Sequence, residues 1–140
     1  MITSVKSISL KTTPEMAFAA VSDPFTMEKW YSGMSDVKEI TNFPLNKGSV
    51  FTCKIRWMGT MRFEFASFQP YEGLIHDSVM WLGTGNHTFT FIHEGETILF
   101  TQIMQLKLHG FGWLLWPFMK LILNSGLEKQ NKELKVFLES

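Results

Sequence analysis

A change in hydrophobic period divides this chain. From Val37 to Leu108 apolar and polar residues alternate, and Gly or Pro interrupts the alternation at short intervals. A period of two is typical of strands that are buried on one face, and the interruptions indicate hairpin turns. The pattern predicts six strands in an antiparallel meander, at about 36–43, 48–57, 61–69, 74–82, 86–93 and 97–108.

The segment before the meander predicts one further strand and two short helices. Residues 4–11 alternate like a strand. The run Thr12-Thr13-Pro14-Glu15 then combines an N-cap threonine, expected at Thr12, with a first-turn proline and a capping-box glutamate, so we expect a helix over 15–21. Asp23-Pro24 repeats the cap-and-proline signal, and a second short helix is expected to end near Trp30.

After Gly110 the sequence predicts one long helix. Apolar residues recur at spacings of three and four from Met119 to Leu138, and charged residues occupy the opposite face. Such a helix can cover the buried face of a curved sheet. The fold class is therefore α+β: a helix-grip arrangement (β-α-α-β6-α) of about seven antiparallel strands wrapped around a long C-terminal helix, in a single domain over 1–140.

Turn positions predict the register of two hairpins. We expect a two-residue loop at 94–95 and a three-residue loop at 58–60. These loops would pair His93 with Glu96, Phe89 with Phe100, His87 with Gln102, Ile55 with Phe63 and Cys53 with Phe65. Both registers place the aromatic residues on one face of the sheet, and a slip of one residue would scatter them.

The aromatic face beneath the helix has the composition of a ligand pocket. Phe and Met together supply 22 of the 140 residues, and such deformable apolar side chains suit irregular apolar ligands. We expect a cavity between the long helix and the sheet. Its expected lining is Phe51, Ile55, Trp57, Phe63, Phe65, Phe89, Phe91, Phe100, Met104, Trp30, Met119, Leu123 and Leu127, with His87 and Gln102 as polar members.

His87 and Gln102 are the first candidates for chemistry. They are expected side by side on an apolar face, where an unpartnered polar group costs about 1–3 kcal/mol. In one interpretation they hold the polar end of an apolar ligand, with His87 as a general base. In the other, they satisfy each other's hydrogen bonds, or His87 lies at a strand end that is open to water.

The strand expected at 74–82 has two possible orientations. One face carries Leu74, His76, Ser78 and Met80, and the other carries Ile75, Asp77, Val79 and Trp81. The second set is more apolar, and we expect it to point inward. An inward Asp77 would lose its hydration and have a raised pKa, as in a proton-transfer site, whereas an outward Asp77 would be an ordinary solvated carboxylate.

Several classes of protein are excluded by composition. With 13 basic and 13 acidic residues the chain lacks the positive charge that nucleic-acid binding needs. Cys53 is the only cysteine, so no internal disulfide forms, and its apolar neighbours predict an inert thiol. The four histidines lack metal-site spacing, and no phosphate-binding glycine loop is present. We therefore expect neither a metal nor a cofactor.

The most apolar segment, 111–123, is too short to cross a membrane as a helix, and the N-terminus lacks the apolar core of a signal peptide. A cytoplasmic protein is the expectation. Trp113 and Trp116 beside Pro117 have two interpretations. They form a gated mouth or a patch for transient membrane contact, or they simply close the core.

The order of elements resembles the START-like, or SRPBCC, superfamily. Thr13-Pro14-Glu15 with Asp23-Pro24 is similar to the opening of that family, and His87-Thr88-Phe89 with Gly95-Glu96-Thr97 is similar to its penultimate hairpin. Residues 131–135 resemble its closing helix, and the polyketide cyclase/dehydrase-like branch is the most similar. The resemblance covers the whole chain. It implies a cavity that takes small hydrophobic molecules, sometimes with chemistry and often without.

Three functions remain from the sequence. The first is binding of a hydrophobic ligand such as a lipid, an isoprenoid or an aromatic metabolite. The second is a cyclase/dehydrase-like enzyme that moves a proton with His87 or Asp77. The third is a protein-partner module like the related chaperone-ATPase activators. Binding is favoured because the sequence identifies no acid–base pair; it indicates no oligomeric state.

Overall fold

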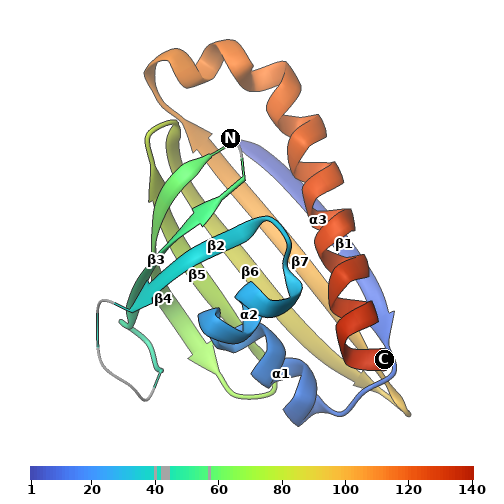
Figure 1. The fold of residues 1–140 in the computed structure, drawn as a ribbon. Coiled ribbons are helices and arrows are strands. Elements are labelled where there is room, and N and C mark those ends of the chain that lie inside the picture. The colour runs from blue at the N-terminus through green and yellow to red at the C-terminus, as the bar shows by residue number, and fades with distance from the viewer. Residues whose placement is uncertain (40, 42–44, 57) are drawn as a thin grey trace.

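The computed structural model describes residues 1–39, 41, 45–56 and 58–140, and in this part of the chain it contains one antiparallel sheet in the order β1-β7-β6-β5-β4-β3-β2 (Figure 1). The elements in chain order are β1 (Ile2–Leu10), α1 (Pro14–Ser22), α2 (Pro24–Trp30), β2 (Met34–Glu39), β3 (Val50–Ile55), β4 (Gly59–Gln69), β5 (Gly73–Met80), β6 (Gly83–Glu94), β7 (Thr97–Leu108), the 3₁₀ helix η1 (Gly110–Leu115) and α3 (Trp116–Glu139). The predicted helix-grip fold is confirmed.

The two short helices begin at the predicted proline signals. The Thr13 side chain accepts a hydrogen bond from the Met16 N–H at 3.2 Å, so the N-cap is Thr13 and not the expected Thr12. Pro14 then occupies the first helical position, where no N–H donor is needed. Asp23 caps α2 in the same way, accepting from the Phe25 N–H at 3.0 Å.

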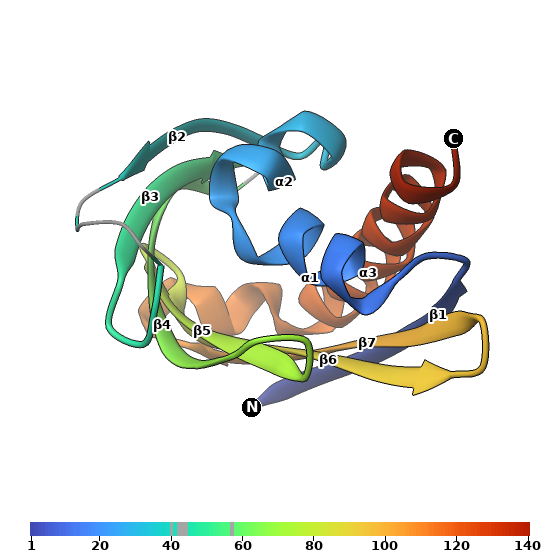
Figure 2. The same ribbon diagram turned by 90° about the horizontal axis from the view of Figure 1, so that it is seen from below.

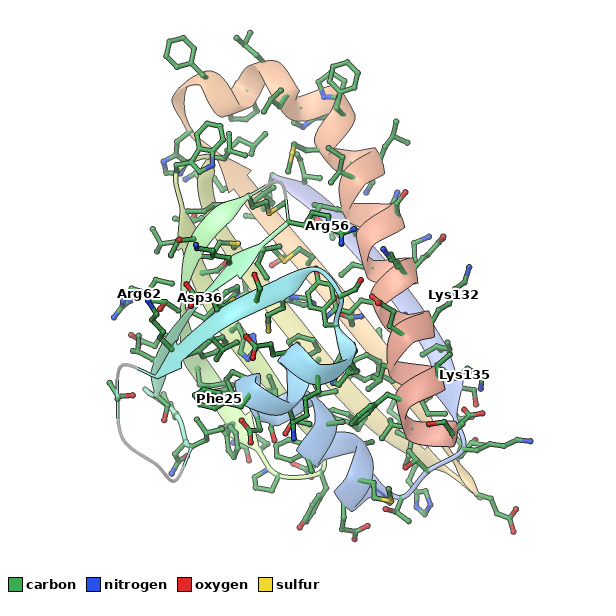
Figure 3. The ribbon with its side chains drawn as sticks, viewed as in Figure 1. Phe25, Asp36, Arg56, Arg62, Lys132 and Lys135 are labelled. Carbon is green, nitrogen blue, oxygen red and sulfur yellow. The ribbon has the colours of Figure 1, made fainter. Side chains whose placement is uncertain are left out.

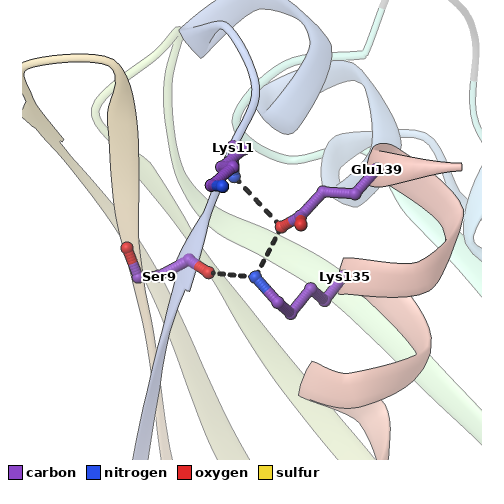
Figure 4. A network of polar contacts seen from close by, with 4 residues as sticks. All are labelled: Ser9, Lys11, Lys135 and Glu139. Atoms are coloured by element: carbon purple, nitrogen blue, oxygen red, sulfur yellow. Dashed lines mark hydrogen bonds and ion pairs between the residues drawn. The ribbon is translucent and has the colours of Figure 1, made fainter.

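The sheet is strongly curved, and all three α-helices lie on its concave side (Figure 2). α1 and α2 sit inside the curve, and α3 runs beside β1. Polar contacts fix α3 to that edge strand. Lys135 donates to the Ser9 carbonyl at 3.0 Å and contacts Glu139 at 2.6 Å, while Glu139 accepts from the Lys11 N–H at 3.1 Å (Figure 4).

The two hairpins have a different register from the predicted one but the same inward face. The β6–β7 turn is Gly95-Glu96, because Gly95 adopts the positive φ of 62° that the turn needs. Its pairs are Glu94 with Thr97, Phe91 with Phe100, Phe89 with Gln102 and His87 with Met104. Between β3 and β4 the pairs include Ile55 with Gly59, Cys53 with Met61 and Phe51 with Phe63. Because both shifts are even numbers of residues, the side chains stay on the predicted face up to Phe65, where a β-bulge turns Phe68 inward in place of Ser67.

The expected orientation of β5 was wrong. Its buried residues are Leu74, His76, Ser78 and Met80, whereas Val79 and Trp81 are exposed. Asp77 lies on the outer face and accepts a hydrogen bond from the Asn86 amide at 2.9 Å. Counting apolar residues failed here because the neutral His76 ring packs as an aromatic, in contact with the rings of Phe51, Phe63, Phe65 and Phe89.

Candidate functional site: an apolar cavity with a neutral polar end

A cavity of about 590 Å³ lies between α3, α2 and the concave face of the sheet. The size is within the range of small-molecule sites. Most of its wall is apolar, from β3, β4 and β6 below and from α3 above. Exposed residues at one end, including Arg56, Leu121, Ser125 and Lys129, show that the cavity opens to the surface there. Arg56 is labelled in Figure 3, where it lies between the sheet and α3.

The structure divides the residues of the predicted lining into two groups. The residues that do line the cavity are Phe51, Ile55, Phe63, His87, Phe89, Met104, Leu123 and Leu127. Those that are buried outside its wall are Trp30, Phe65, Phe91, Phe100, Gln102 and Met119. Trp57 lies outside the described residues. Part of the aromatic face is thus solid core, because α1 fills the curve beside it: Phe18 contacts the Phe91 ring at 5.7 Å between ring centroids.

Several residues that line the cavity are absent from the predicted lining. They are Met27, Tyr31, Met34, Arg56, Met58, Met61, His76, Leu121, Ile122, Lys129 and Gln130, together with the small residues Ser32, Gly33, Ser125 and Gly126. Met61 already lies on the predicted inward face of its strand, and the correct orientation of β5 would have added His76. The residues of α2 and its exit had no signal beyond proximity to Trp30, since only the folded chain brings them to the cavity.

A polar relay joins three elements at the inner end of the cavity. His87 Nε2 and Gln102 Oε1 are 2.8 Å apart, and Gln102 Nε2 donates to Asn131 Oδ1 at 2.6 Å. The prediction that His87 and Gln102 lie within hydrogen-bonding distance is confirmed, although the two are diagonal neighbours. Since the Gln102 amide group donates to α3, its carbonyl faces the imidazole, and His87 must donate from Nε2. The lone pair of the ring therefore resides on Nδ1.

His76 and His87 are paired across β5 and β6, and both rings line the cavity. Burial, together with the neighbouring His87, lowers the pKa of His76 to about 3. Burial also lowers the pKa of His87 to about 4, against the opposing effect of the hydrogen bond to Gln102. Both imidazoles are therefore neutral at neutral pH, and the inner end of the cavity is polar without being charged.

Comparison with known proteins agrees with this architecture. A family model described as "Polyketide cyclase / dehydrase and lipid transport" matches residues 1–139. The chain belongs to this family. No curated protein matches the chain.

Solved structures of low sequence identity share the fold of this polyketide cyclase/dehydrase family member. The di-domain ARO/CYC protein StfQ from the steffimycin biosynthetic pathway gives a TM-score of 0.81 at 9% identity, over 99% of this chain and 50% of StfQ. TTHA0849 from Thermus thermophilus gives 0.79 at 15% identity, over 95% and 94% of the two chains. Aha1 from Colwellia psychrerythraea gives 0.75 at 14% identity, over 99% and 97%. These likenesses concern the fold alone.

Tyr31 adds a neutral hydroxyl to the cavity of this family member. Burial, followed by the nearby Glu133 and Cys53, raises the pKa of Tyr31 to about 12, so the phenol keeps its proton. A Cβ atom at position 33 would lie 2.8 Å from the Tyr31 ring, so glycine at this position leaves room for that ring against the cavity wall. The buried thiol of Cys53 has its pKa raised to about 12 by burial and remains protonated and unreactive.

Other candidate chemistry is placed outside the cavity. Asp77 is exposed on the outer face of the sheet, so of its two interpretations the structure supports the ordinary solvated carboxylate and not the desolvated carboxyl of a proton-transfer site. Among the described residues, no three His, Cys, Asp or Glu side chains gather as metal ligands. Within the same part of the chain, no helix is long and apolar enough to span a membrane.

Proposed function

We propose that this protein binds a small apolar molecule that carries a neutral oxygen or nitrogen at its buried end. The observation that carries the proposal is the 590 Å³ cavity with Met, Phe and Leu walls and uncharged imidazoles at its inner end. A buried carboxylate or ammonium on the ligand would meet no opposite charge there, and burying an unpaired charge is strongly unfavourable. A lipid, an isoprenoid or an aromatic metabolite with a hydroxyl or carbonyl group satisfies these conditions.

The ligand's polar group has three candidate partners. His87 offers its Nδ1 lone pair as an acceptor, because the relay to Gln102 and Asn131 holds the proton on Nε2. His76 and Tyr31 also line the cavity. Among the described residues, His76 Nε2 has no hydrogen-bond partner, and such a buried unsatisfied group favours a ligand or water that would pair with it.

Native mass spectrometry of protein purified from its own source tests the proposal directly. We expect a co-purified small molecule that denaturation releases. The proposal is contradicted if the native protein carries no such molecule and also fails to bind the neutral probe N-phenylnaphthylamine.

A variant that fills the opening provides a second test. Gly126 lies on α3 at the cavity, and an added Cβ meets no atom within 4 Å, so a side chain can begin at this position without a clash, and Gly126→Phe places an aromatic ring at the opening. Replacing a helical glycine also favours the helix. We expect the affinity for N-phenylnaphthylamine to fall by about tenfold or more as the entry is blocked. Val136→Phe, on the exposed part of the same helix, is the matched control and should bind like the wild type.

A second candidate function is acid–base catalysis of the cyclase/dehydrase type in the same cavity. The relay favours it, because it gives a neutral imidazole a defined tautomer, as a general base requires, whereas the pKa of about 4 makes that imidazole a weak base at neutral pH. The two functions differ in the fate of the ligand. A molecule recovered unchanged after incubation supports carriage, whereas conversion that is lost in His87→Gln, with binding retained, supports catalysis.

A further inference from the structure

The surface where η1 meets α3 carries a dense group of exposed apolar side chains. We name this group the apolar apron: Phe111, Trp113, Leu114, Trp116, Phe118 and Leu121. Phe111 is 85% exposed and Leu114 is 73% exposed, and the least exposed member, Trp116, is still 47% exposed. Figure 3 shows side chains extending outward from this end of the ribbon, at the top of the view. Folded proteins rarely expose contiguous apolar surface of this kind unless it contacts something.

The apron is held in place by packing beneath it. The His109 N–H donates to the Leu82 carbonyl at 2.8 Å, and a Cβ at Gly112 would lie 2.8 Å from the same carbonyl oxygen. η1 is thereby fixed against the β5–β6 turn, where Trp81 is 70% exposed. Met119 turns inward and is buried. The apron side chains face outward because the inward positions of this segment are already filled.

The charges within the apron's own segment of the chain are of one sign. From Thr97 to Leu127 the sequence contains no Asp or Glu, and its charged residues are Lys107 and Lys120. Two further cations, Arg56 and Lys129, stand at the cavity opening. Exposed Trp, Phe and Leu with flanking Lys and no carboxylate is the composition of segments that lie in the headgroup region of a bilayer. This charge pattern complements an anionic lipid surface.

The apron is continuous with the entry to the cavity. Leu121 belongs to the apron and lines the cavity, and the next residue, Ile122, is exposed and lines it as well. An apolar molecule that leaves the cavity over these side chains would meet apolar surface before it met water. If the apron lies on a bilayer, the molecule exchanges with the lipid phase directly.

We propose that the apolar apron docks this protein on the surface of an anionic lipid bilayer, with the cavity opening facing the lipid. The docking goes beyond the proposed ligand binding and depends on the apron, not on what occupies the cavity. A second copy of the chain is the competing occupant of such a surface, and the experiment below separates the two.

Vesicle flotation tests the docking. Wild-type protein is mixed with phosphatidylcholine vesicles with or without phosphatidylglycerol, and the bound fraction is measured. We expect about tenfold more binding to the anionic vesicles, decreasing at high salt. The double variant Trp113→Ser and Phe118→Ser should lose this binding. The matched control is Val5→Ser with Ile92→Ser, two exposed apolar residues on the sheet, which should bind like the wild type.

Three further measurements make the result decisive. Circular dichroism establishes that each variant is folded. Light scattering gives the oligomeric state: a wild-type dimer that the apron variant dissociates, with no vesicle binding, would overturn the proposal in favour of a subunit interface. Equal binding of the apron variant and the wild type would overturn it too. Gly126→Phe adds an aromatic side chain at the opening and should float at least as well as the wild type while binding less N-phenylnaphthylamine, so that failure of the ligand proposal and failure of the docking proposal are distinguishable.

Discussion

The two halves of α3 cover the same sheet in different ways. In the C-terminal half, Leu134 has no exposed surface and packs into a continuous core. In the N-terminal half, Leu123 and Leu127 occupy the same apolar stripe of the helix but line an open cavity. α1 fills the curve beside the C-terminal half, whereas the curvature toward β3 and β4 leaves space beneath the N-terminal half (Figure 2). The comparison teaches that one amphipathic stripe can be core at one end and ligand wall at the other.

The largest expected effect tests this difference directly. Leu134→Ala should lower the free energy of unfolding by about 3–5 kcal/mol, because it leaves a new cavity in packed core. Leu127→Ala should cost only about 1–2 kcal/mol, because its side chain already borders empty space. Denaturant titration of both variants measures the difference. Equal losses would mean that the cavity end is as tightly packed as the closed end.

The next effect concerns pH and the two imidazoles of the open half. Their pKa values, about 3 for His76 and about 4 for His87, lie below the ordinary value of 6.5. As the pH falls below about 6.5 the unfolded chain binds protons that the folded chain does not, so stability is lost down to about pH 4. We expect a loss of about 3 kcal/mol from each ring over this window, because one pKa unit corresponds to about 1.4 kcal/mol. His76→Leu should reduce the slope between about pH 6.5 and 5, where carboxyl groups contribute little.

His93→Leu is the matched control for that measurement, because His93 is exposed at the end of β6. The effect of His76→Leu is judged against this variant, which also replaces one histidine with leucine but lies outside the cavity. A slope that His76→Leu leaves unchanged would show that His76 is protonated in the folded state as readily as in the unfolded chain.

The relay between the two halves gives a smaller effect with a specific signature. Gln102→Leu leaves His87 Nε2 and Asn131 Oδ1 without their partner and should cost about 1–3 kcal/mol. Long-range ¹⁵N–¹H NMR should show the His87 ring changing from the Nε2–H tautomer to a mixture. Gln105→Leu, on the outer face of the same strand, should preserve the tautomer. If His87 is unchanged in the first variant, the relay does not set its protonation.

The smallest effect is expected at the surface contacts of the closed half. Glu139→Gln removes the charge that Lys135 and the Lys11 N–H contact. Exposed ion pairs contribute little to stability, because water screens them and ordering two side chains is unfavourable. The midpoint of thermal unfolding should stay within experimental error of the wild type. A clear decrease would indicate that the polar contacts, and not Leu134, hold this half of the helix on the sheet.

The sequence alone was sufficient for the architecture. Alternation from Val37 to Leu108 and the helical stripe after Gly110 predict the strands and α3, because one buried face imposes a period of two on a strand and 3.6 on a helix. The same periodicity placed His87 and Gln102 on one face even though both hairpin registers were displaced. Displacements by an even number of residues exchange cross-strand partners but preserve the face.

Only the tertiary structure decided where the core ends and the cavity begins. Phe65 and Phe89 belong to the same inward set, but Phe65 is solid core and Phe89 is ligand wall, because sheet curvature and the positions of α1 and α2 are properties of the whole chain. Tertiary packing also decided the orientation of β5. A neutral histidine counts as polar in a sequence, but it packs as an aromatic ring among phenylalanine rings. Periodicity specifies faces, and the space between those faces depends on long-range packing that a local pattern does not contain.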